Sequence, residues 1–148
     1  SSKIYLDTAQ SIREQLKEVG ITVNLEMIEW ATWLSDVYTN RKYVASLAGL
    51  AGKMEPDAIL RRYTSTYSKN FTNFNNAKYD ALIEEAKRTS NEAKQIENYK
   101  EAQKILAEEQ AAIFLMDPNT IIATEKGLEG FEFYPLPYFN FAKLYFKK

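Results

Sequence analysis

Residues 9–30, AQSIREQLKEVGITVNLEMIEW, carry two different hydrophobic patterns one after the other. In the first part, apolar residues spaced three and four apart predict an amphipathic helix, which Asp7 or Thr8 caps and Gly20 ends. In residues 21–27, apolar and polar residues alternate, which is the pattern of a half-buried strand. A helix followed directly by a strand is typical of an α/β domain.

The remaining elements extend this pattern in both directions. An apolar run at residues 4–6 is predicted as an earlier strand, which would give a strand–helix–strand unit and a parallel strand pair. The predicted fold class is α/β, with a mixed sheet of about five strands flanked by helices. Helices are expected at 31–40, 56–63, 79–86 and 91–106, further strands at 43–51, 112–116 and 121–124, and an irregular polar loop at 64–76.

The composition is that of an ordinary globular domain and limits the possible functions. The chain has 148 residues, 45% of them hydrophobic, which is enough for one domain with its own core. Its 19 basic and 20 acidic residues give a net charge of -1, so we expect no nucleic acid partner. Histidine and cysteine are both absent, which removes the commonest general base, the thiolate nucleophile and the usual transition-metal ligands. We therefore expect neither a metal site nor a cofactor.

Two acidic residues near a predicted helix start are the candidates for catalysis. Glu55 and Asp57 are the pair that a carboxylate-based hydrolase would use, as glycosidases use paired carboxylates. The simpler explanation is a helix that begins at Pro56, because acidic side chains stabilise the positive end of a helix. A partner-binding adaptor is a further alternative, suggested by the charged helices and the aromatic-rich end of the chain. The sequence contains no nucleotide-binding, zinc-protease, serine-hydrolase or calcium-binding motif.

Aromatic and amide side chains are the candidates for contacting a ligand. Trp30 and Trp33 lie three apart at a helix start and share one face, so they either belong to the core or offer a flat stacking surface. Asn73 lies in a loop that mixes amides with aromatic rings, as the rim of a polar-ligand site would. Turn chemistry explains that loop equally well.

The end of the predicted strand at 43–51 is another candidate region. Ligands of α/β sheets bind beyond the carboxyl ends of the strands, and glycines there let the backbone approach a ligand closely. The alternative is that these glycines only permit a bend before the next helix. The candidate ligand-binding residues of this region are Gly49, Leu50, Ala51, Gly52, Lys53 and, at the start of the next helix, Asp57.

Five stretches of the chain are informative in their order and spacing. They are AQSIREQLKEVGITVNLEMIEW (9–30), LAGLAGKMEPD (47–57), FTNFNNAKYDALIEEA (71–86), NYKEAQKILAEEQAAIFL (98–115) and GLEGF (127–131). Together they resemble the carboxy-terminal portion of the peptide/nickel (family 5) solute-binding proteins of ABC importers. The resemblance implies the second lobe of a two-lobed, periplasmic-binding-protein-like fold (type II, cluster C), formed by residues 1–124. The aromatic-rich residues 125–148 would return toward the missing first lobe.

The same resemblance implies a function. The two lobes would close on a solute and deliver it to an ABC permease, without any chemistry of their own. The solute would be a peptide, with an oligosaccharide or a metal chelate as alternatives, and the missing amino-terminal lobe would complete the site. The protein would act outside the cell or in the periplasm. Because the chain begins with Ser1 and shows no signal-peptide pattern, we expect that an amino-terminal lipoprotein signal has been removed.

One departure from the family bears on the solute. Peptide-binding relatives commonly carry a tryptophan and then an aspartate that pairs with the amino terminus of the peptide. Here Leu50 stands near the tryptophan position, and Gly52 or Lys53 near the aspartate position. Lysine cannot pair with an ammonium group, so the resemblance implies a ligand that carries a carboxylate, or an anionic metal chelate.

Overall fold

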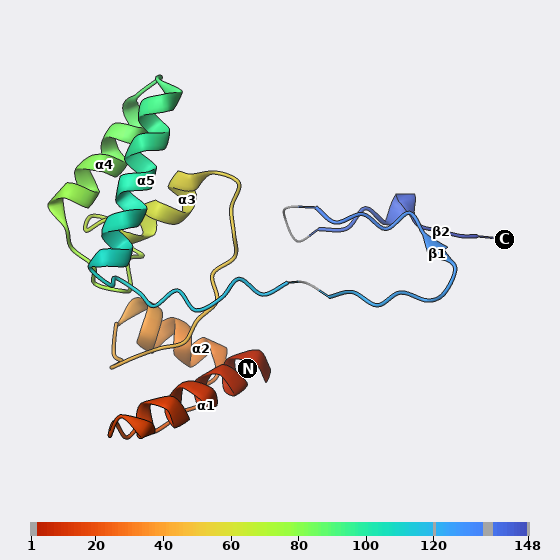
Figure 1. Cartoon of the computed structure of the whole chain (residues 1–148), viewed down its shortest axis with the longest axis horizontal. Coiled ribbons are helices and arrows are strands. Elements are labelled where there is room, and N and C mark those ends of the chain that lie inside the picture. Colours follow the sequence, from red (N-terminus) through yellow and green to blue (C-terminus); the bar gives the residue numbers. More distant parts are fainter. Residues whose placement is uncertain (1–2, 120, 135–137, 148) are drawn as a thin grey trace.

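Three helices in the middle of the chain form its core, and the computed structural model describes residues 3–119, 121–134 and 138–147. Figure 1 shows α4 and α5 side by side and the carboxy-terminal segment extending away from them. No helix among the described residues is both long and apolar enough to cross a membrane. The helical segments are α1 (Lys3–Glu18), α2 (Trp30–Thr32), η1 (Trp33–Thr39), α3 (Pro56–Leu60), η2 (Arg61–Tyr63), α4 (Ala77–Arg88), α5 (Glu92–Glu108) and η3 (Phe141–Lys143). The strands are β1 (Leu128–Glu129) and β2 (Tyr145–Phe146).

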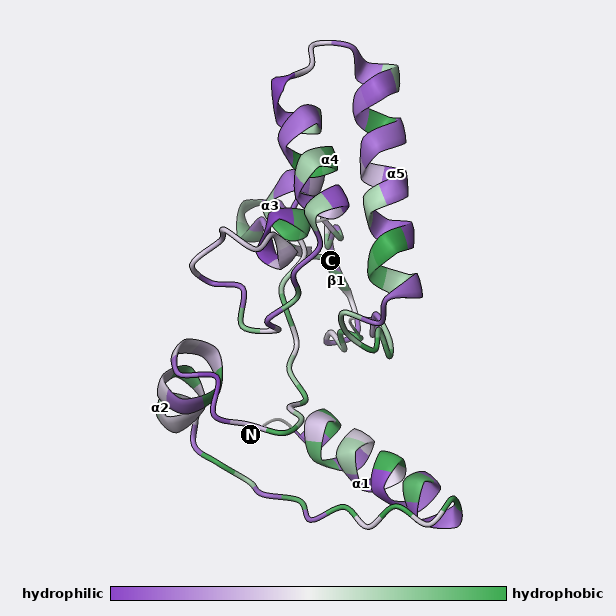
Figure 2. Ribbon diagram, turned by 90° about the vertical axis from the view of Figure 1, so that its left-hand side faces the viewer, coloured by the Kyte–Doolittle hydropathy of each residue, from purple (hydrophilic) through white to green (hydrophobic). Residues whose placement is uncertain are grey.

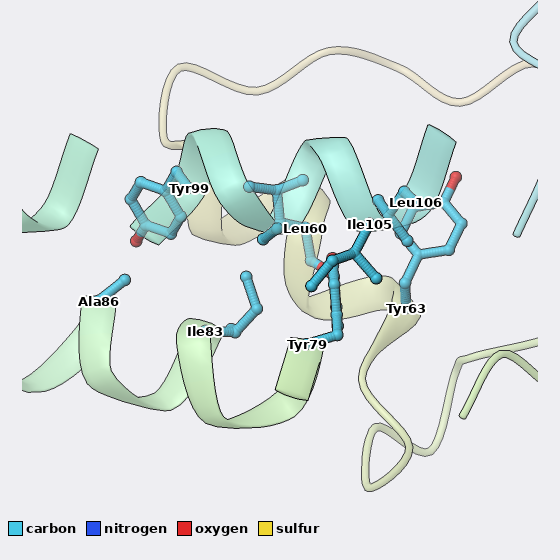
Figure 3. Close-up of a cluster of buried hydrophobic side chains, with 9 residues drawn as sticks. Leu60, Tyr63, Tyr79, Ile83, Ala86, Tyr99, Ile105 and Leu106 are labelled. Carbon is cyan, nitrogen blue, oxygen red and sulfur yellow. The ribbon is translucent and has the colours of Figure 1, made fainter. Parts of the chain in front are cut away.

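The core lies where α3, α4 and α5 meet. Tyr79 and Ile83 of α4 are fully buried, and Leu60 of α3 packs with them against α5 (Figure 3). Hydrophilic residues cover much of the outer surface of α4 and α5 (Figure 2), as the spacing of their apolar residues predicts. The predicted helices at 56–63, 79–86 and 91–106 are therefore confirmed. The buried apolar residues of this core are Leu60, Tyr63, Tyr79, Ile83, Ala86, Tyr99, Ala102, Ile105 and Leu106.

Asparagine caps determine where the two long core helices begin. The side-chain oxygen of Asn76 accepts a hydrogen bond from the backbone N–H of Tyr79 at 2.8 Å. The side-chain oxygen of Asn91 accepts one from the backbone N–H of Lys94 at 3.1 Å. Each cap satisfies a helix N–H that has no partner within its own helix, so short polar residues suffice to start α4 and α5.

Helix α1 begins earlier than predicted. It starts at Lys3 and includes residues 4–6, so the predicted first strand is wrong. Asp7 does not cap the helix but forms an ion pair with Lys3 one turn away, a pairing that supports helix at these residues. The end of α1 is as predicted, because Gly20 has a φ of 82° and its N–H donates to the carbonyl of Lys17 at 3.0 Å.

The central sheet that the sequence predicts is not formed by residues 3–119, 121–134 and 138–147. Residues 21–27, 43–51, 112–116 and 121–124 contain no strand. Among the described residues the sheet consists of β1 and β2 alone, with two residues each. The expectation of about five strands in a mixed sheet is therefore wrong for this chain.

The missing strands have a physical explanation. A strand exists only when a neighbouring segment accepts and donates its backbone hydrogen bonds, whatever the pattern of its side chains. Val23 and Leu25 are still less exposed than Asn24 between them, but Ile21 and Met27 are exposed, so the alternation of a strand is seen only in part. Val44 and Ile121, however, are 105% and 92% exposed. These segments have the composition of buried strands, but no neighbour among the described residues covers them.

The carboxy-terminal segment folds into a hairpin that the sequence did not predict. Strand β1 pairs antiparallel with β2, with Glu129 opposite Tyr145. The side chains of this pair also meet, since the Tyr145 hydroxyl donates to the Glu129 carboxylate at 2.9 Å. Within the predicted terminal segment 125–148, residues 135–137 and 148 lie outside the described residues.

Gly130→Ala is expected to open this hairpin. Gly130 has a φ of 83°, and a Cβ atom there would lie 1.9 Å from the backbone carbonyl oxygen of Lys143, which cannot move without breaking the pairing. Gly127 is the matched control, because its φ is 90° but a Cβ atom meets nothing within 4 Å. Gly127→Ala should cost only the left-handed backbone strain, about 1–2 kcal/mol. Cross-strand proton contacts between Glu129 and Tyr145 in NMR spectra should be lost in Gly130→Ala and weakened less in Gly127→Ala; equal loss in both would contradict the steric argument.

Candidate functional site

Four aromatic side chains from α2, η1 and the loop at 64–76 form a cluster, which we call the aromatic platform. Trp30 stacks on Trp33, with ring centroids 5.0 Å apart and ring planes 5° apart. Phe71 meets Trp33 edge-on at 5.8 Å and lies 5.3 Å from Tyr38 between ring centroids. The platform (Trp30, Trp33, Tyr38 and Phe71) therefore joins the helix that follows residue 29 to a distant loop.

The two tryptophans differ in what they can offer a ligand. The indole N–H of Trp33 donates to the hydroxyl of Ser46 at 3.0 Å, and its ring is half-buried between neighbours. Trp30 is 66% exposed and is covered by Trp33 on one face only. The sequence left open whether these tryptophans pack in the interior or offer a stacking surface. Packing against neighbours fits Trp33, and an open stacking surface fits Trp30.

The segment at 43–53 is attached to the platform at its start. The hydroxyl of Tyr43 donates to the backbone carbonyl of Phe71 at 2.5 Å. Partial burial raises the pKa of Tyr43, and the nearby Arg41 opposes this only in part. The hydroxyl thus stays protonated near neutral pH and keeps its proton for this bond.

The glycines of this segment have different surroundings. A Cβ atom on Gly49 would lie 2.3 Å from the Tyr5 hydroxyl, so Gly49 lets the segment pass close to α1. The prediction that Gly49 makes room for a ligand therefore has a competing explanation within the chain. A Cβ atom on Gly52 meets nothing within 4 Å, so its backbone is open to a ligand. Leu50, Ala51 and Lys53 are exposed on either side of it.

The two acidic residues lie at the start of α3. Glu55 occupies the N-cap position with an exposed side chain and makes no capping bond. Asp57 lies in the first turn and forms an ion pair with Arg61 at 3.6 Å, one turn away. These positions are those of a charged helix start, and the pairing of Asp57 with Arg61 gives the carboxylate a structural role.

The surface hollows and the acidic groups elsewhere among the described residues do not include a second site formed by the predicted residues. Two shallow surface hollows on α4 and α5, lined by residues such as Glu84, Arg88 and Lys104, contain none of the predicted site residues. Within residues 3–119, 121–134 and 138–147, no group of three or more acidic residues is placed to hold a metal ion. The aromatic platform with segment 43–53 is therefore the candidate site.

Comparison with known proteins identifies relatives along nearly the whole chain. No protein-family model matches it. The oligopeptide-binding protein AppA of Bacillus subtilis (strain 168) is 29% identical over 137 residues, which are 90% of this chain and 25% of AppA. The periplasmic murein peptide-binding protein MppA of Escherichia coli (strain K12) is 31% identical over 93 residues, which are 63% of this chain and 17% of MppA. The homologues of this chain are family 5 peptide-binding proteins.

The structure supports this family 5 relationship. The solved structure of MppA in its unliganded open form matches with a TM-score of 0.66 at 28% identity, over 75% of this chain and 22% of MppA. Since MppA is a two-lobed periplasmic binding protein, this chain is a helix-rich part of that α/β fold. The chain spans 25% of AppA and 17% of MppA, so it corresponds to a quarter or less of either relative. Both relatives are named as binding proteins and neither as an enzyme.

Asn73 lies in the loop that also carries Phe71 of the platform. Its φ of 59° places it in the left-handed region that asparagine tolerates better than most residues, and its side chain is exposed. This geometry fits the turn explanation and leaves the amide free to face a ligand. Asn70 and Phe71 belong to the same loop that the sequence indicates as a possible ligand rim, but their contacts with the platform were not predicted. Tyr38 and Tyr43 were missed, because their importance depends on contacts between segments that no local spacing reveals.

Proposed function

We propose that this chain is one lobe of an extracellular solute-binding protein, which captures a peptide-like solute between two lobes for an ABC importer. The observation that carries the proposal is the relationship to AppA, a protein named for oligopeptide binding, over 90% of this chain. Residues 1–124 would form the second lobe. Without the first lobe the chain holds only part of a solute site, which agrees with its coverage of 25% of AppA.

The aromatic platform is the surface that would meet the solute. Trp30 offers a flat, apolar face without any rearrangement, and Gly52 leaves the backbone beside Lys53 open. Solute held against this surface would be enclosed when the other lobe closes over it, and the closed form would be favoured by contacts made only there. The exposed cation of Lys53 favours a solute with a carboxylate, so a peptide carboxyl group is the group we assign to it; an oligosaccharide or a metal chelate is the alternative.

The carboxy-terminal hairpin fits a role in joining the two lobes. Its aromatic side chains remain accessible, with Phe133 and Phe141 65% and 70% exposed. An apolar surface of this kind is stabilised when another part of the protein covers it. We therefore propose that residues 125–148 return toward the first lobe. Because relatives of this chain are periplasmic proteins, the protein would work in the periplasm or outside the cell. An amino-terminal lipoprotein signal would tether it to the membrane.

The test compares this chain with the protein that its complete gene encodes. Calorimetric titration with a tripeptide library should give saturable binding to the full-length protein and none of comparable affinity to the 148-residue chain. Affinity arises from contacts with both lobes, so a half-site loses most of it. Submicromolar peptide binding by the isolated chain would contradict the half-site proposal. An upstream reading frame without a first lobe would contradict the two-lobed architecture.

A further inference from the structure

Asn70 is a buried side chain at the base of the loop that carries Phe71. It is 4% exposed, and its amide nitrogen donates to three backbone carbonyls. These belong to Thr64 at 3.1 Å and Phe74 at 2.8 Å, with a longer bond to Tyr63 at 3.4 Å. Its side-chain oxygen accepts from the Thr72 hydroxyl at 2.8 Å. Asn70 therefore fixes both ends of a loop that has no regular secondary structure to hold it.

The loop connects the helical core to the aromatic platform. Asn70 donates to the backbone carbonyl of Tyr63, and the side chain of Tyr63 is part of the buried core cluster. Phe71, the next residue after Asn70, places its ring against Trp33 and Tyr38. Its carbonyl receives the Tyr43 hydroxyl, which ties in the segment at 43–53. One buried amide thus fixes the position of a side chain on which the tryptophan stack rests.

We propose that Asn70 is a positioning residue for solute binding, which acts through Phe71 to hold Trp33 and the Trp30 face that stacks on it. The role in solute binding rests on the proposed function, whereas the contacts from Asn70 to the platform are those of this chain alone. A purely structural asparagine would support the helical core and leave the platform unaffected. All four side-chain hydrogen bonds of Asn70 instead go to residues of the loop and its two ends, at positions 63, 64, 72 and 74.

Asn98 provides a matched control. It is the same residue type, it is 1% exposed, and it lies in α5 within the helical core. Its amide nitrogen is buried and has no hydrogen-bond partner among the described residues. Asn70→Ala and Asn98→Ala therefore remove the same buried side chain, but only the first removes bonds to the platform loop.

The near-ultraviolet circular dichroism of the 148-residue chain supplies the readout. Its two tryptophans are Trp30 and Trp33, so the tryptophan band reports on the platform alone. This band depends on fixed packing of the rings, whereas the far-ultraviolet signal reports helix content. Asn70→Ala should lose most of the tryptophan band and keep its helix signal, while Asn98→Ala should keep both. Tyr43→Phe, which removes one hydroxyl and leaves the hydrogen bonds of Asn70 intact, should lose part of the band.

A double substitution tests whether Asn70 acts through Phe71. Phe71→Leu should reduce the tryptophan band as Asn70→Ala does, and the double variant should show no further loss, because the two residues then act as one unit. An unchanged band in Asn70→Ala, or in Tyr43→Phe if Asn70→Ala fails to fold, overturns the proposal. The proposal is also overturned if Asn70→Ala loses the tryptophan band and the helix signal together while Tyr43→Phe keeps its tryptophan band. The readout needs no ligand, so failure of the full-length protein to bind peptides contradicts the proposed function and leaves this result interpretable.

Discussion

Tyr79→Ala is expected to lower the free energy of unfolding by about 3–5 kcal/mol, the range for removing a buried aromatic side chain. The Tyr79 side chain is 0% exposed at the centre of the contact between α4 and its neighbours. Its ring meets Phe74 edge-on with centroids 5.5 Å apart, and its hydroxyl donates to the carbonyl of Leu60 at 2.5 Å. The substitution leaves a cavity and an unpaired carbonyl together, so both losses add. Urea unfolding followed by helix circular dichroism measures the change.

Two further variants separate the contributions. Tyr79→Phe keeps the ring but leaves the carbonyl of Leu60 without its partner, and should cost about 1–3 kcal/mol. Tyr145→Ala removes the same side chain where it is 56% exposed, and should change stability by no more than about 0.5 kcal/mol. Equal costs for Tyr79→Ala and Tyr145→Ala would show that the packing of α3, α4 and α5 is not what stabilises the chain.

The helices of this chain were predictable because the information that forms them is local. A helix satisfies its backbone within four residues, so a periodic apolar stripe and a cap are enough to specify it. Gly20 follows the end of α1, and α5 begins after Asn91, as the sequence predicts, whereas the cap predicted at Asp7 or Thr8 lies inside α1. The error at residues 4–6 arose where an apolar run of three fits either element.

The strands were not predictable in the same way. Of the four apolar residues that alternate at 21–27, only Val23 and Leu25 are partly buried, while Ile21 and Met27 are 50% and 67% exposed. A strand also requires a partner that the pattern does not identify. The hairpin of β1 and β2 shows the converse. Its two strands are two residues long each, too short for any alternation to be detected, and they exist because the chain folds back on itself.

The candidate site was partly predictable for a related reason. Trp30 and Trp33 lie three apart on a helix, and that spacing alone places the rings side by side. Phe71 and Tyr43 join the platform through contacts across the chain, which spacing cannot reveal. Gly49 has a second explanation that spacing could not reveal: a Cβ atom there would meet the Tyr5 side chain of α1, which lies far away in the sequence.

The second large effect is expected at the platform itself. Under the proposed function, Trp30→Ala should weaken peptide binding by the full-length protein. An aromatic anchor at the centre of a binding site contributes about 2 kcal/mol when truncated, which is roughly a 30-fold increase in Kd. Trp30 is 66% exposed in this chain, so its removal should leave the free energy of unfolding nearly unchanged. Calorimetric titration gives the affinity, and urea unfolding of the same samples gives the stability.

The controls for Trp30→Ala separate stacking from general loss of apolar surface. Trp30→Phe keeps a flat ring over Trp33 and should recover most of the affinity, because stacking needs the face of a ring more than its size. Ile96→Ala removes an apolar side chain that is 45% exposed on α5, away from the platform, and should not change Kd. If Trp30→Ala and Ile96→Ala bind peptide equally well, Trp30 does not face the solute, and its stacking on Trp33 serves the packing of α2 alone.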